Sequence, residues 1–141
     1  MHNIYHDLVI NCPPVKVFEA ITQPIHLNNW WSLQSSGTPI LDTEYNLNFT
    51  DDYDWFGKVS KVEQNTSFYI TMTSSDDDWN GTTFGFELKP EKGNTLVEFS
   101  HCGWKSNNHH FRHSSFCWAQ LLNGLKNYLE KGIVIPFEKR N

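Results

Sequence analysis

The middle of the chain, from residue 43 to residue 102, alternates between apolar and polar positions. Tyr45, Leu47 and Phe49 illustrate this period of two, which is typical of β-strands that bury one face. Polar turns separate the successive runs, and strands joined by short turns favour an antiparallel meander. We therefore predict strands over five segments, which are residues 43–49, 55–63, 67–73, 82–89 and 95–102.

The N-terminal part of the chain predicts one strand followed by two short helices. Residues 3–10 are rich in β-prone side chains and stop before a pair of prolines. Pro14 suits the first turn of a helix, and an apolar stripe follows it as far as Ile21. Pro24 cannot continue that helix without strain, so we expect a second short helix from Pro24 to Trp31.

A 3.6-residue period of apolar positions predicts one long helix over residues 109–131. Gly132 is a natural C-terminal stop, and Pro136 follows soon after it. At 1.5 Å per residue such a helix is about 35 Å long, enough to cross a sheet. An antiparallel sheet needs one face covered, so the pattern predicts an α+β fold in which this helix supplies the cover.

Composition narrows the class of protein. The 141 residues suit a single domain over 1–141, and an aromatic content of 15% excludes intrinsic disorder. A net charge of −5 without a basic stripe argues against nucleic-acid binding. The chain has no apolar run long enough for a membrane span, and its first residues do not resemble a signal peptide. Together with an odd number of cysteines, three, this predicts a cytoplasmic protein.

His101 is the polar residue that stands out in the predicted sheet. The period of two places it on the same face as Val97 and Phe99, and this apolar face should point toward the long helix. It could orient a ligand or act as an acid or base near neutral pH. The alternative is a buried histidine that is hydrogen-bonded within the core. The chain contains neither a G-x-S-x-G motif nor a glycine-rich phosphate loop, and we assign no catalytic residue.

Titratable residues gather at the predicted turns and at the start of the long helix. The acidic segments 51–54 and 76–78 close alternate hairpins, so both should lie at the end of the meander where the connection to the helix begins. His109, His113 and Cys117 are four residues apart, and two histidines at that spacing can share Zn²⁺. Solvated charge in turns and at a helix start is the alternative. We assign no metal ligand and expect no cofactor.

The order of these elements resembles the helix-grip fold of the START-like superfamily, also called Bet v 1-like or SRPBCC. More narrowly, the sequence resembles the branch related to the activator of heat-shock protein 90 ATPase. The matching segments are 13–31, 99–104 and 118–132. The resemblance implies a curved antiparallel sheet wrapped around the C-terminal helix, with a cavity between them. Members of the superfamily bind lipids, sterols, polyketides or other apolar molecules there, and a minority carry out reactions in the cavity.

We therefore expect a binding protein for a small hydrophobic or amphipathic molecule, as a monomer or weak homodimer. The open alternatives are an enzyme that uses His101 as acid or base, and a protein-interaction module of the co-chaperone kind. A pocket for such a molecule should be lined mainly by aromatic side chains with one or two polar groups. The expected ligand-binding residues are Trp30, Trp31, Phe49, Trp55, Phe84, Phe86, Phe99, His101, Trp104, Trp118 and Leu122.

Overall fold

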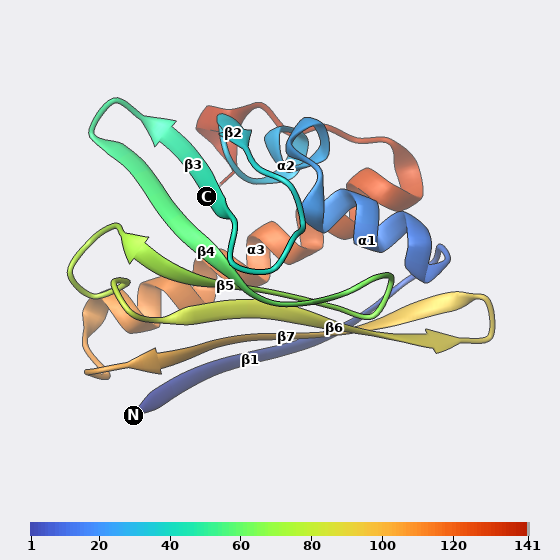
Figure 1. The fold of residues 1–141 in the computed structure, drawn as a ribbon. Coiled ribbons are helices and arrows are strands. Elements are labelled where there is room, and N and C mark those ends of the chain that lie inside the picture. The colour runs from blue at the N-terminus through green and yellow to red at the C-terminus, as the bar shows by residue number, and fades with distance from the viewer. Residues whose placement is uncertain (141) are drawn as a thin grey trace.

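A computed structural model describes residues 1–140 of the chain. Seven strands form one antiparallel sheet in the order β1-β7-β6-β5-β4-β3-β2. Figure 1 shows a curved sheet with α3 lying across one face and with α1 and α2 on the same side. The elements in chain order are β1 (His2–Ile10), α1 (Pro14–Thr22), α2 (Pro24–Trp30), β2 (Gln34–Ser36), β3 (Glu44–Thr50), β4 (Tyr53–Glu63), β5 (Ser67–Ser74), β6 (Thr83–Glu91), β7 (Asn94–Trp104), α3 (His109–Lys131) and the short 3₁₀ helix η1 (Phe137–Lys139).

This architecture is the α+β helix-grip fold, as predicted. Both short helices begin at the expected prolines, Pro14 and Pro24. The long helix has the predicted limits, and Gly132 ends it with a positive φ of 68°. Such a left-handed conformation is easily reached by glycine, which has no Cβ.

Most strand limits differ from the predicted ones by one or two residues, and two differences have a plain physical cause. Strand β6 runs on through Pro90 to Glu91, because at that point it pairs with β7 and no longer with β5. A proline is tolerated where one side of the strand needs no hydrogen bond. The edge strand β2 was not predicted, since its three residues Gln34–Ser36 are polar and show no apolar alternation.

The core lies between the inner face of the sheet and α3. Inner residues of adjacent strands stand directly opposite each other, as Phe84 does to His101 and Phe86 to Phe99. Against them α3 packs a buried stripe that includes Trp118, and the stripe continues with Leu121, Leu122 and Leu125. The predicted inward direction of both strands is therefore confirmed.

The chain end folds back onto the molecule after α3. Arg140 donates from Nη1 to the carbonyl oxygens of Trp31 and Ser32, at 3.3 and 3.0 Å, and from Nε to that of Ile135 at 2.8 Å. These bonds hold the C-terminal segment beside α2, where Figure 1 shows it returning. No helix within residues 1–140 is both long and apolar enough to cross a membrane.

Candidate functional site: an aromatic cavity at the start of helix α3

A cavity of about 420 Å³ opens beside the N-terminal half of α3. Its wall comes from five regions: the end of α2, the β3–β4 hairpin, the β5–β6 loop, α3 and the C-terminal segment. The lining residues are Trp31, Phe49, Tyr53, Trp55, Asp76, Trp79, His110, His113, Ser114, Cys117, Trp118, Leu121, Phe137 and Arg140. Aromatic rings thus make up much of the wall, while polar groups come mainly from α3, the acidic loop and the chain end.

Five of these aromatic side chains form a closed circuit. The ring centroids lie 5.6 Å apart for Trp31 and Phe49, 5.4 Å for Phe49 and Trp55, and 4.8 Å for Trp55 and Trp79. The circuit closes with 5.9 Å between Trp79 and Trp118 and 5.0 Å between Trp118 and Trp31. Distances between 4.5 and 7 Å are those of interacting aromatic pairs. The five rings, called the aromatic circuit below, therefore support one another and form a continuous apolar surface.

The aromatic circuit has a buried part and a more exposed part. Trp118, Trp31 and Trp79 are only 1%, 5% and 7% exposed, so they form the floor of the cavity. Phe49 and Trp55 are half-buried on β3 and β4. Tyr53, which contacts Trp55 from the hairpin end, is 49% exposed. A ligand that enters at this end would cover the hairpin rings and rest on the three tryptophans.

His101 lies beneath the floor and does not line the cavity. The indole Nε1 of Trp118, which can only donate, donates to Nδ1 of His101 at 3.0 Å. The proton of the neutral ring must therefore sit on Nε2, which contacts Oγ1 of Thr82 at 2.8 Å. Burial, together with a smaller effect of His110, lowers the pKa of His101 to about 3. With both ring nitrogens in use and no exposure, His101 is placed to orient Trp118.

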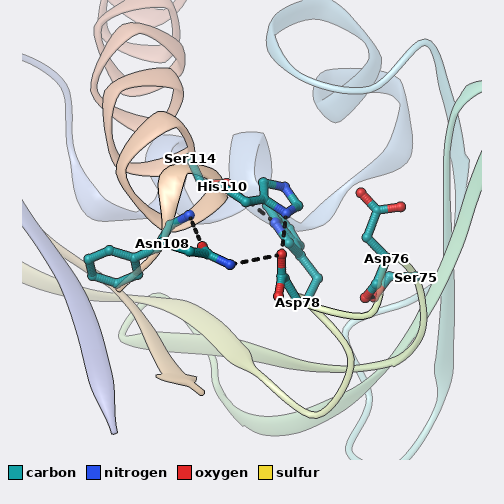
Figure 2. Close-up of polar contacts among 8 residues, drawn as sticks. Ser75, Asp76, Asp78, Asn108, His110 and Ser114 are labelled. Carbon is teal, nitrogen blue, oxygen red and sulfur yellow. Dashed lines mark hydrogen bonds and ion pairs between the residues drawn. The ribbon is translucent and has the colours of Figure 1, made fainter. Parts of the chain in front are cut away.

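The β5–β6 loop is fastened to the start of α3 by polar contacts. Asp78 accepts from Nδ1 of His110 at 3.0 Å and from Nδ2 of Asn108 at 3.4 Å, as Figure 2 shows. Asn108 in turn caps α3 by accepting from the backbone N–H of Phe111 at 3.0 Å. The predicted meeting of acidic turns and histidines is confirmed for the second turn, at Asp78 and His110.

The next turn of α3 adds a thiol and an imidazole to the cavity wall. Sγ of Cys117 lies 3.4 Å from Nε2 of His113, and burial raises the pKa of this thiol. His113 also stacks on His109 with ring centroids 5.9 Å apart. Within residues 1–140, no three His, Cys, Asp or Glu side chains come together in the manner of a metal site.

The expected ligand-binding residues fall into two groups. Trp31, Phe49, Trp55 and Trp118 are among the residues that line the cavity. The others lie in the core: Trp30, Phe84, Phe86, Phe99, His101, Trp104 and Leu122. The period of two correctly placed the strand residues of this group on the inner face, but α3 covers that face along the middle of the sheet. The aromatic cavity lies toward the end of the sheet where α3 begins.

Sequence reasoning missed several residues of the cavity wall. Trp79 and Asp76 belong to a loop that was interpreted as an acidic turn, and Tyr53 belongs to another. A large aromatic residue inside a charged turn, such as Trp79 after three aspartates, was the signal that could have found this loop. Arg140 gave no such signal, because only the folded chain brings it to Trp31, more than a hundred residues earlier in the sequence.

Comparisons with known proteins place this fold among solved structures. The solution structure of an Aha1 dimer from Colwellia psychrerythraea is 28% identical and superposes with a TM-score of 0.85, covering 94% of this chain and 98% of that one. A crystal structure of a Mesorhizobium loti protein, 20% identical, has a TM-score of 0.82 and covers 94% and 100%. A crystal structure of a Staphylococcus saprophyticus protein, also 20% identical, superposes with a TM-score of 0.80 and covers 95% of this chain and 96% of that one.

No curated protein sequence matches the chain. The model of the family described as "Activator of Hsp90 ATPase homolog 1-like protein" matches residues 11–130, which is most of the sequence. The chain therefore belongs to this family, a branch of the START-like superfamily.

Proposed function

We propose that the protein binds a small hydrophobic or amphipathic molecule in the cavity lined by the aromatic circuit. The observation that carries the proposal is the set of five mutually contacting aromatic side chains that line a space of about 420 Å³. Ligand sites typically have volumes of roughly 300–1,000 Å³ and walls that are mostly apolar with a few polar groups. The cavity has this size and this chemistry.

Desolvation supplies the driving force for such binding. The hairpin rings Phe49, Trp55 and Tyr53 are partly open to water, so a ligand that covers them removes apolar surface from solvent. Burial of apolar surface contributes about 25 cal/mol per Å². The polar groups at one edge, among them Ser114 and His110, can then orient a polar end of the molecule.

A binding role is better supported than catalysis by His101. A general acid or base must reach the proton that it transfers, whereas His101 is fully buried with both nitrogens engaged by Trp118 and Thr82. If the protein is instead an interaction module, a partner protein should bind while the cavity stays empty. The two remaining roles are separated by whether a small molecule occupies the cavity.

Native mass spectrometry of protein purified without an affinity tag, followed by solvent extraction, tests the proposal. We expect a discrete added mass that extracts as an organic compound. We also expect the neutral fluorescent probe N-phenyl-1-naphthylamine to bind, and the variant Trp55→Ala to bind it at least about tenfold more weakly, since one wall of the cavity is lost. Phe116→Ala is the matched control, because Phe116 is 62% exposed on α3 and does not line the cavity.

A bare polypeptide mass combined with no binding of the probe would overturn the proposal. Equal probe binding by wild type and Trp55→Ala would do the same, because the probe would then occupy another place. Thermal unfolding of both variants, followed by circular dichroism, shows whether each is folded before its binding is compared.

A further inference from the structure

We propose that the aromatic cavity selects an organic cation, an ammonium ion carrying apolar substituents, and that the carboxylate of Asp76 is its counter-charge. This inference rests on the proposed function, since it names the chemical class of ligand for the same cavity. It follows from two independent features of the cavity wall: the aromatic circuit and one carboxylate without a partner.

The aromatic circuit provides a surface with which cations interact favourably. The faces of aromatic rings carry partial negative charge, and tryptophan attracts a cation most strongly. Three of the five rings are tryptophans buried at the floor, Trp31, Trp79 and Trp118, and Trp55 adds a fourth. Successive rings are tilted by between 24° and 68° relative to each other, so they present differently oriented surfaces to the cavity that they line. Quaternary ammonium groups are bound in aromatic cages of this kind.

Asp76 differs from its neighbour Asp78 in what its carboxylate contacts. Asp78 is engaged by His110 and Asn108, whereas within residues 1–140 the Asp76 carboxylate has no hydrogen bond or ion pair. Asp76 is half-buried, lines the cavity and comes from the loop that carries Trp79. Figure 2 shows it outside the network of dashed contacts that joins Asp78, Asn108 and His110. A free carboxylate next to an aromatic wall complements a cation.

The other charged groups of the wall are already engaged. Arg140 uses Nε and Nη1 for backbone carbonyls of Ile135, Trp31 and Ser32, and so serves to hold the chain end. Arg140 is hydrogen-bonded to the backbone carbonyl of Trp31. In the aromatic circuit, Trp118 lies between Trp31 and Trp79. His110 faces Asp78. The carboxylate available to a ligand at the Trp79 side of the cavity is therefore that of Asp76.

A pair of ligands that differ only in charge tests this inference. Benzyltrimethylammonium and its uncharged carbon isostere neopentylbenzene have the same shape and the same number of heavy atoms. Binding to wild type is followed by NMR, through the indole N–H signals of the tryptophans. We expect the cation to bind about tenfold more tightly than the isostere, with affinity that falls as salt is added.

Asp76→Asn should weaken cation binding by about five- to tenfold and leave the isostere unchanged, because only charge is removed. Its carboxylate makes no hydrogen bond or ion pair within residues 1–140, so the variant should fold as wild type does. Asp77→Asn is the matched control, since Asp77 is an exposed aspartate in the same loop and lies off the cavity wall. This control distinguishes a direct interaction between the cation and Asp76 from the general attraction of an acidic loop for cations.

Three results would overturn the inference. They are equal binding of cation and isostere, tighter binding of the anion phenylacetate than of either, and an equal effect of Asp76→Asn and Asp77→Asn on cation binding. Each leaves the proposed function standing if the neutral probe still binds in a Trp55-dependent way. If the cation does not bind at millimolar concentration and the isostere does not bind up to its solubility limit, the inference fails, and the neutral probe alone decides the proposed function.

Discussion

At the scale of single residues, His101 determines how the floor of the cavity is held. It accepts a hydrogen bond from Trp118 and contacts Thr82, whose hydroxyl donates to the carbonyl oxygen of Trp79 at 2.6 Å. Two of the floor tryptophans are thereby joined through one imidazole. The neutral ring is required for this arrangement, because a protonated Nδ1 could no longer accept from an indole N–H.

His101 should make the protein lose stability in acid. Its pKa is lowered from 6.5 to about 3 by burial, so between these values the unfolded chain binds a proton that the folded chain does not. The free energy of unfolding should therefore fall as pH decreases below 6.5, with a contribution approaching about 1.4 kcal/mol per pH unit. Above pH 6.5 both states are neutral at this residue and the contribution is constant.

The variant His101→Gln isolates this effect. Glutamine offers a hydrogen-bond acceptor and a donor but does not titrate. The free energy of unfolding of the variant should therefore depend less on pH. Urea unfolding at several pH values between 4 and 7.5 measures the difference between wild type and variant. We expect wild type to be more stable at neutral pH and its advantage to shrink as pH falls. Parallel curves for the two proteins would show that His101 is not the titrating group.

At the scale of elements, the start of α3 and the β5–β6 loop form one unit. Asn108 accepts from the N–H of Phe111 and donates to Asp78, so the residue that caps the helix also fixes the loop that carries Trp79. The cavity lies at this junction, and its shape depends on both elements. The ion pair of Asp78 and His110 is partly exposed and contributes little to stability by itself.

Asn108→Ala should therefore affect both stability and the cavity. Loss of an N-cap side chain costs about 1 kcal/mol. Chemical denaturation measures this cost, and hydrogen exchange should become faster in the first turn of α3 and in residues 75–82. Asn108→Ser should restore the stability, because serine caps helices well. Ser106→Ala is the control from the same connection. Faster exchange throughout the protein, rather than in these two segments, would contradict the assignment.

At the scale of the whole molecule, the cavity is completed by the chain end. Phe137 and Arg140 lie on its wall, and Arg140 is bonded to the backbone at the end of α2. Residues 133–135, by contrast, remain 37–48% exposed, so the chain end is held at its far end rather than along its length. We therefore expect the hydrogen bonds of Arg140 to hold this side of the cavity in place.

Arg140→Ala should release the chain end and open the cavity. We expect the neutral probe to dissociate several-fold faster, while the free energy of unfolding changes by less than about 1 kcal/mol, as for a few partly exposed hydrogen bonds. Stopped-flow displacement of the probe measures the rate. Lys139→Ala is the control, since Lys139 is exposed and adjacent in sequence. Equal dissociation rates in wild type and Arg140→Ala would show that the chain end does not close the cavity.

The period of the apolar residues was sufficient to predict the three α-helices and the long strands. Alternation located the long strands, and the prolines and Gly132 placed the ends of all three helices to within a residue or so. These signals are local, because backbone geometry alone dictates the spacing of side chains on one face. The edge strand β2 could not be predicted in this way, since its polar residues acquire β structure only by pairing with β3.

By itself the sequence determined which residues face the core, but only the tertiary structure decided where space remains. Phe86 and Phe99 lie on the inner face as predicted, yet both are buried, with Trp118 of α3 packed against Phe99. The cavity formed instead at one end, between Trp79 in a charged loop and Trp31 at the end of α2. A periodic pattern specifies the direction of a side chain, whereas an unfilled volume depends on how separate segments of the chain meet.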